Sequence, residues 1–258
     1  MHYVSAGAGA PALVFVHGFT CDHTDWKSQL EALQRHHEVV ACDLRGHGAT
    51  PGRPEECSIG HYGGDVAALI ANLEFRRAVL VGHSMGCRVV LEAARLDPSR
   101  IAGVALIDGS RQGTGDPETA AANARAMMSG EGFMASFFAQ MFLRPSAESA
   151  AIVERAKRLR PEIGLALFGA MARWDAGQME AALAALRAPL LVIQTTRMNA
   201  QRQRTPLKAG ETSPWLDLVR SRVPGARIEV LPGLGHFAQL EAPGEVNRLL
   251  ATFAAGCR

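Results

Sequence analysis

The residue most clearly placed for chemistry in this chain is Ser84. It lies in the sequence Gly-His-Ser-Met-Gly at 82–86, between the apolar run Ala78–Val81 and a largely apolar stretch that continues to Ala94. A serine on a sharp turn between a strand and a helix has strained backbone geometry, and glycine two residues before and after it lets neighbouring segments pass closely. The pattern predicts a nucleophile elbow, whose serine attacks a carbonyl carbon.

Such a nucleophile needs donors for the oxyanion that its attack creates. A helix that begins directly after Ser84 directs free backbone N–H groups and the positive end of its dipole toward that position. A second source of donors is the turn His17-Gly18-Phe19, which follows the apolar run Ala12–Val16. We assign the oxyanion hole to the backbone N–H groups of Phe19 and Met85.

The elements that must position these residues alternate between strands and helices. A mostly parallel sheet with right-handed crossovers and flanking helices follows from this alternation, which predicts an α/β fold. The expected strands are 2–5, 12–16, 39–44, 78–81, 101–108, 189–194 and 227–232, and the expected helices include 26–33, 62–73, 88–94, 215–223 and 246–253.

Composition limits the classes of function. The chain has 258 residues, of which 48% are hydrophobic and 20% charged, with a net charge of +2, as expected for one large globular domain. No basic run is interleaved with aromatic residues, which argues against nucleic acid and membrane surfaces as partners. No motif supports metal, phosphate or hydride chemistry, so we expect no metal and no cofactor, and a small-molecule substrate.

The cysteines and the first residues bear on the compartment. The five cysteines are scattered, without a Cys-x-x-Cys pair, and are expected to be reduced thiols: Cys21, Cys42, Cys57, Cys87 and Cys257. Neither a signal peptide nor a run long enough to span a bilayer is visible. We therefore expect a cytoplasmic protein that is a monomer or a homodimer.

Four stretches together resemble the α/β-hydrolases. They are His-Gly-Phe at 17–19, Asp-Leu-Arg-Gly-His-Gly at 43–48, the elbow at 82–86 and Gly-His-Phe at 235–237, in the order of that family. The resemblance spans nearly the whole chain and implies an α/β-hydrolase core formed by residues 1–112 and 187–258. We expect Asp43 and His47 to have structural roles, because a compact glycine-rich turn needs local hydrogen-bond partners.

Residues 113–186 interrupt the alternation and resemble the helical cap that the family inserts after the strand ending near Asp108. This segment is rich in Ala, Met and Phe at helical spacings. Most of these side chains are expected to pack in the core, and the rest to line an apolar pocket suited to a hydrophobic acyl or alcohol group. The residues expected to contact substrate are Phe19, Phe138, Met141, Phe142 and Trp174.

The resemblance implies that His236 is the general base, whereas His83, beside the nucleophile, is not. Relatives commonly place the acid that orients this histidine after the strand at 189–194, but residues 195–204 contain no Asp or Glu. Two candidates remain. Asp108 ends the strand that follows the elbow helix, a location that some family members use, and Glu211 precedes the helix at 215–223. We favour Asp108.

The expected activity is hydrolysis of a carboxylic ester through an acyl-enzyme. Carbon–carbon bond hydrolysis, lactone opening and perhydrolysis use the same residues and stay open, as does a receptor-like protein with vestigial hydrolysis. The basic loop at 197–208 contains Arg197, Arg202, Arg204 and Lys208. One of its arginines is expected to contact a carboxylate on the substrate or on a partner subunit.

Overall fold

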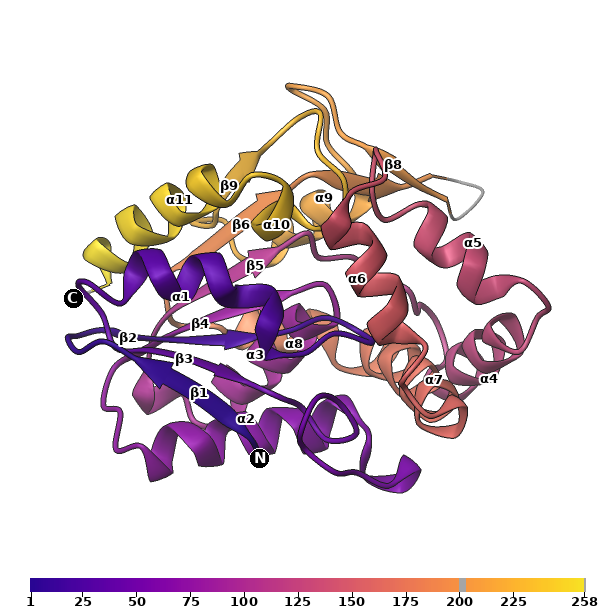
Figure 1. Ribbon diagram of the computed structural model, residues 1–258, viewed down its shortest axis with the longest axis horizontal. Helices are drawn as coiled ribbons and strands as arrows, with labels where there is room; N and C mark the ends of the chain where they lie inside the picture. Colours follow the sequence, from indigo (N-terminus) through magenta and orange to yellow (C-terminus); the bar gives the residue numbers. More distant parts are fainter. Residues whose placement is uncertain (200–202, 258) are drawn as a thin grey trace.

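A twisted, mostly parallel sheet forms the centre of the computed structural model, which describes residues 1–199 and 203–257 (Figure 1). Within these residues the sheet has seven strands in the order β1-β3-β2-β4-β5-β6-β9, and only β1 runs antiparallel to its neighbour. The strands are β1 (Tyr3–Ala6), β2 (Ala12–Val16), β3 (Val39–Cys42), β4 (Ala78–His83), β5 (Ile101–Ile107), β6 (Leu190–Gln194) and β9 (Arg227–Val230). The predicted α/β fold is confirmed.

Helices cover both faces of the sheet because its central strands are apolar on both sides. In β2, Leu13 and Phe15 belong to the core on one face, whereas Val14 and Val16 belong to the core on the other. The first face is covered by α1 (Lys27–Leu33), α10 (Ala238–Glu241) and α11 (Pro243–Gly256). The second is covered by α2 (Ile59–Asn72), α3 (Met85–Leu96), α8 (Met179–Ala185) and α9 (Pro214–Arg222). Short 3₁₀ helices are η1 (His23–Trp26), η2 (Pro54–Glu56) and η3 (Pro98–Arg100).

The segment between β5 and β6 folds into helices that gather beyond the carboxyl ends of the parallel strands, at the right of Figure 1. Before α8 they are α4 (Pro117–Met128), α5 (Phe133–Ala139), α6 (Ala147–Ala156) and α7 (Pro161–Gly177). We call α4–α7 the cap helices. Among the described residues, no helix combines the length and the apolar character needed to cross a membrane.

A small antiparallel hairpin follows β6 where the sequence analysis expects a loop. It pairs β7 (Thr196–Met198) with β8 (Arg204–Pro206), so that Arg197 lies opposite Thr205. Strands of three residues are too short to show a hydrophobic period, which is why the pattern does not reveal them. The hairpin extends from the carboxyl end of β6 toward the cap helices (Figure 1).

Candidate active site

Ser84 joins the end of β4 to the start of α3 with a left-handed backbone, φ 55° and ψ −112°. The flanking glycines are required by close approach: a Cβ on Gly82 would lie 2.4 Å from the Gly86 oxygen, and one on Gly86 2.3 Å from the Val16 oxygen. The Ser84 amide donates a 2.9 Å hydrogen bond to the Ile107 carbonyl of β5. The turn is thereby held from both sides, with the serine at the carboxyl edge of the sheet.

The loop after β2 runs past the elbow. His17 is buried and accepts a hydrogen bond at Nε2 from the Leu44 amide, 3.0 Å, so its Nδ1 donates to the Gly18 carbonyl, 2.8 Å. Burial lowers the pKa of His17 to about 3, and the ring is a neutral brace for the loop. Within the described residues, the amides of Phe19 and Met85 donate no hydrogen bond. Both remain free to bind an anion.

The structure brings Asp108 and His236 together across 128 residues of sequence. Asp108 Oδ2 lies 2.6 Å from His236 Nδ1, and both side chains are buried. Asp108 also accepts hydrogen bonds from the Thr195 and Thr196 amides at 2.9 and 2.8 Å, and from the Thr196 hydroxyl at 2.5 Å. A guanidinium nitrogen of Arg204 completes this shell at 3.0 Å. These contacts fix the orientation of the carboxylate and replace the hydrogen bonds that water would make with it.

These contacts set the charges of the pair. Burial alone raises the pKa of Asp108, but the hydrogen bond and positive charge of His236, with the charge of Arg204, outweigh it and lower that pKa to about 2. Burial lowers the pKa of His236, the Arg204 charge lowers it further, and Asp108 opposes both, leaving a pKa of about 4. At neutral pH the site holds an ionised Asp108 and a neutral His236 able to accept a proton.

The other predicted residues of this region have different partners. Glu211 accepts from the Lys208 amide at 3.0 Å and lies 3.9 Å from a guanidinium nitrogen of Arg197, so Asp108 rather than Glu211 is the carboxylate bonded to His236. His83 Nε2 donates to the His236 carbonyl at 2.9 Å, and burial lowers the pKa of His83 well below its ordinary value. Arg202 lies outside the described residues.

Ser84 and His236 line the same pocket, which side chains almost fill. Its volume is about 10 Å³, roughly the space of one water molecule. Phe19, Phe138 and Met141 are among its lining residues. The side chains of Phe137 and Phe138 on α5, with Met141 just after it, separate Ser84 from larger spaces beneath the cap.

Two of the expected substrate contacts lie elsewhere. Phe142 stacks on Phe237, with ring centroids 4.8 Å apart, and lines a larger cavity. Trp174 is not among the residues that line the Ser84 pocket. The Trp174 side chain is buried, with 6% exposed. Its indole N–H donates to Glu92 of α3 at 3.2 Å, because the face of α7 that carries Trp174 packs against α3.

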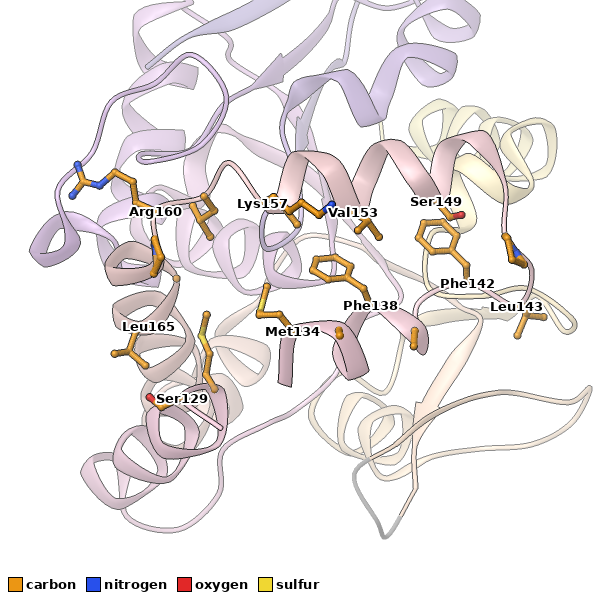
Figure 2. Close-up of a pocket in the computed structure, with 18 of the residues that line it drawn as sticks. Ser129, Met134, Phe138, Phe142, Leu143, Ser149, Val153, Lys157, Arg160 and Leu165 are labelled. Carbon is orange, nitrogen blue, oxygen red and sulfur yellow. The ribbon is translucent and has the colours of Figure 1, made fainter. Parts of the chain in front are cut away.

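A large cavity lies among the cap helices next to the Ser84 pocket. Its volume is about 930 Å³, and Figure 2 shows side chains of α5, α6 and α7 converging on it. Met134, Phe138 and Val153 form part of its wall, and its cationic side chains are Arg144, Lys157 and Arg160. Phe138 lines both this cavity and the Ser84 pocket, so its ring is part of the wall between them.

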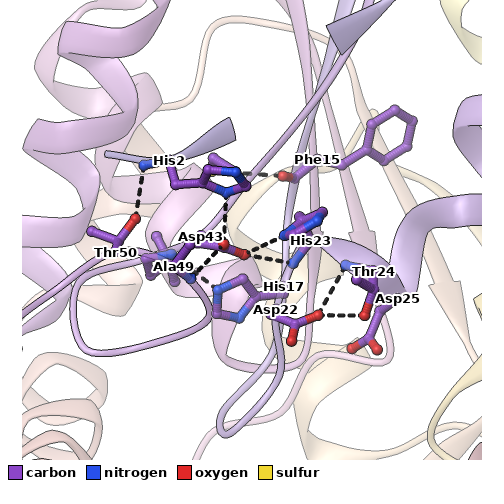
Figure 3. A network of polar contacts seen from close by, with 12 residues as sticks. His2, Phe15, His17, Asp22, His23, Thr24, Asp25, Asp43, Ala49 and Thr50 are labelled. Atoms are coloured by element: carbon purple, nitrogen blue, oxygen red, sulfur yellow. Dashed lines mark hydrogen bonds and ion pairs between the residues drawn. The ribbon is translucent and has the colours of Figure 1, made fainter. Parts of the chain in front are cut away.

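Asp43 is a structural centre, as expected, rather than part of the Ser84 site (Figure 3). Its carboxylate accepts from the amide and ring of His23, both at 2.8 Å, from the Ala49 amide at 2.9 Å, and lies 2.8 Å from His2 Nδ1. His2, His23 and Asp43 present ligand atoms within 4.8 Å of one another. Because these hydrogen bonds occupy both carboxylate oxygens, the geometry accounts for the cluster as a brace of the glycine-rich turn.

Comparison with known proteins places this geometry in context. Residues 13–249 match the model of the alpha/beta hydrolase family. Over 99% of its length the chain is 30% identical to the dihydrolipoyllysine-residue acetyltransferase component of the acetoin cleaving system of Cupriavidus necator, of which it covers 67%. The chain thus spans about two thirds of that relative.

Two further likenesses are informative. The chain is 40% identical to a non-heme haloperoxidase of Rhodococcus erythropolis over 41% of this chain and 39% of that protein. The crystal structure of a hydrolase from Pseudomonas aeruginosa superposes with a TM-score of 0.78 at 26% identity, covering 97% of this chain and 92% of that one.

Proposed function

The chain belongs to the alpha/beta hydrolase family, and on this premise we propose that it is a serine hydrolase that cleaves a carboxylic ester of a small, largely apolar substrate. The observation that carries the proposal is the 2.6 Å hydrogen bond between buried Asp108 and His236, whose ring lines the same pocket as Ser84. An orienting carboxylate, a neutral imidazole and a serine on a strained turn are the groups that this chemistry needs.

In the proposed reaction, Ser84 Oγ attacks the ester carbonyl while His236 Nε2 takes the hydroxyl proton. Asp108 stabilises the imidazolium that forms, and the amides of Phe19 and Met85 bind the oxyanion. Collapse of the tetrahedral intermediate breaks the bond to the alcohol, which leaves with the proton from His236. Water then attacks the acyl-enzyme, gives its proton to His236, and the acid is released with Ser84 restored.

The surroundings of Ser84 support an apolar substrate. The pocket walls are aromatic rings and Met141, and the adjoining 930 Å³ cavity has mostly hydrophobic walls. Because the Ser84 pocket itself is nearly filled, Phe137, Phe138 or Met141 must move before an ester enters. Apolar side chains with this freedom suit an acyl or alcohol group rather than a sugar.

Turnover of p-nitrophenyl esters of graded chain length tests the proposal, with Ser84→Ala as the matched control. We expect steady release of p-nitrophenol that the substitution abolishes. Release of one equivalent without turnover would instead favour a receptor-like protein, and no reaction of Ser84 with any ester would contradict the proposal. Parallel assays with a lactone, a carbon–carbon hydrolase substrate, and acetate plus hydrogen peroxide distinguish the other reactions that the same groups support.

A further inference from the structure

Arg204 is a buried cation bonded to the carboxylate that orients His236. Its Nη1 donates to Asp108 Oδ2 at 3.0 Å and to the Thr196 hydroxyl at 2.7 Å, and its side chain is 6% exposed. The short strand β8 holds it there, because its backbone amide donates to the side-chain oxygen of Gln140 at 2.7 Å. The carboxylate that it contacts in the structure is the side chain of Asp108.

This ion pair opposes the proposed chemistry. Asp108 is expected to stabilise a positive charge on His236, but Arg204 places a permanent positive charge on the same carboxylate oxygen. Its charge is one of the causes that keep the pKa of His236 low. A group that neutralised Arg204 during catalysis would remove this opposition.

The guanidinium has donors to spare for such a group. A guanidinium has five N–H donors, and within the described residues neither Nε nor Nη2 of Arg204 donates to any acceptor, although Nε is fully buried. A buried donor without an acceptor destabilises the folded protein. These unused donors distinguish Arg204 from a cation whose only task is to pair with Asp108.

The space beside Arg204 can hold an anion. Arg204 lines a cavity of about 380 Å³, and none of the described residues lining it is acidic. Met127, Phe133 and Phe168 form an apolar part of its wall. Phe137 and Met141 line both this cavity and the Ser84 pocket, so the two spaces share this part of their walls.

We propose that the Arg204 cavity binds a carboxylate carried by the substrate, so that the enzyme prefers esters with an anionic group a short carbon chain away from the scissile carbonyl. The proposal rests on the proposed function and specifies its substrate class. The carboxylate pairs with Nη2, the unused donor of Arg204 that is not fully buried, and offsets the charge of Arg204 next to Asp108. The apolar remainder of the substrate extends toward the cap cavity beyond Phe138.

The test compares two p-nitrophenyl esters that differ in one charge, the hemiester of glutaric acid and its terminal amide, after subtraction of spontaneous hydrolysis. We expect kcat/KM to favour the anionic ester by about tenfold to a hundredfold, the range of a hydrogen bond to a charged group. Arg204→Met should bring the ratio of the two values toward one. Arg197→Met, which removes a 42% exposed cation from the same hairpin, should leave the ratio unchanged.

A second pair of variants keeps the test valid if Arg204→Met does not fold. Ser136 is an exposed residue of α5 that lines the same cavity. Ser136→Asp adds a competing carboxylate there and should lower the preference for the anionic ester, whereas Ser136→Asn should not. No anionic preference in the wild type, or a preference unaffected by Ser136→Asp, would overturn the proposal.

The two proposals fail differently. Ser84-dependent hydrolysis of both esters at equal rates overturns the carboxylate site and leaves the serine hydrolase standing. If neither ester is hydrolysed, calorimetric titration with glutarate measures binding to the Arg204 cavity directly. Glutarate binding that is weakened by Ser136→Asp and retained in Ser136→Asn would support the carboxylate site. Absence of glutarate binding would overturn it.

Discussion

Ser84 has a backbone conformation that is strained for any residue with a side chain. A positive φ of this kind costs about 1–3 kcal/mol and persists only where the surroundings enforce it. Here the enforcement comes from β4, from α3 and from the hydrogen bond to Ile107. The sharp turn places the serine at the edge of the sheet, in the pocket that His236 also lines.

At the same scale, the identity of the acid can be tested by two neutral substitutions. We expect Asp108→Asn to lower kcat by about 10⁴-fold, because the amide cannot stabilise the imidazolium, a loss of the size known for serine proteases. Glu211→Gln should leave kcat nearly unchanged, since Glu211 bonds to the Lys208 amide. Steady-state kinetics on a p-nitrophenyl ester decide the matter, and the opposite pattern would refute the assignment of Asp108.

The pH profile tests the electrostatics of His236. The imidazole must be neutral to accept the Ser84 proton, so kcat/KM should rise as the pH increases through its pKa of about 4 and be flat near neutrality. Removing the Arg204 charge raises that pKa, and Arg204→Met should therefore move the acid limb to higher pH. A limb that stays in place, or moves to lower pH, would show that Arg204 does not act on His236.

Single residues could be predicted from the sequence where their signals are local. The elbow around Ser84 and the glycine-rich turn before His236 carry such signals, and Asp108 follows from its place at the end of a strand. The role of Arg204 could not be predicted, because its contact with Asp108 spans 96 residues and depends on the hairpin. The contact of Trp174 with Glu92 could not be predicted either, because helical spacing does not tell which face of α7 packs against α3.

At the scale of elements, the elbow helix is bonded directly to the cap. Arg88 of α3 donates to both carboxylate oxygens of Asp175 on α7, at 2.7 and 2.6 Å, and also to the Ser110 carbonyl at 2.8 Å. Both side chains are at most 2% exposed. The pair fixes α7 relative to α3, the helix that follows Ser84, so the cap helices and the candidate site are positioned together.

Breaking this pair should destabilise the protein strongly. Asp175→Asn leaves the Arg88 charge buried without a counter-ion, which typically costs about 3–5 kcal/mol of the free energy of unfolding. Urea unfolding followed by circular dichroism measures the loss. Glu118→Gln, which removes the exposed partner of Arg173 between α4 and α7, is the control and should have little effect. Equal losses in the two variants would contradict this account of the cap.

The elements themselves were largely predictable. Central strands such as β2 and β4 are continuous apolar runs, and the helices between them carry apolar stripes, so the alternation predicted the parallel sheet. The hairpin β7–β8 was not predictable, because its strands have three residues each and its basic residues are typical of a solvated loop. Without this hairpin, the contact between Arg204 and Asp108 could not be predicted.

On the scale of the whole molecule, two cavities bordered by the cap helices share wall residues with the small pocket that Ser84 lines. Phe138 separates Ser84 from the 930 Å³ cavity, whereas Phe137 and Met141 lie between Ser84 and the Arg204 cavity. This division could not be read from the sequence, which showed only that aromatic residues cluster at 133–142. Their division between cavities depends on how α5 lies across the end of the sheet.

Removing the Phe138 ring should extend the range of substrates. Phe138→Ala connects the Ser84 pocket to the large cavity. The kcat/KM for long-chain p-nitrophenyl esters should therefore rise relative to the kcat/KM for p-nitrophenyl acetate. Each methylene that gains burial contributes about 0.8 kcal/mol, or roughly fourfold. The control is Leu143→Ala, which shortens a side chain that lines the large cavity but not the Ser84 pocket. A loss of activity that is equal for all chain lengths would count against Phe138 as the partition.

The central claim, that Ser84 is a nucleophile activated by His236 and Asp108, is tested most directly by covalent labelling. After reaction with a fluorophosphonate, mass spectrometry of the intact protein and of its peptides should show one adduct per chain, located on Ser84. The adduct should be absent in Ser84→Ala and form far more slowly in Asp108→Asn. Absence of an adduct in the wild type, or an adduct on another residue, would contradict the account.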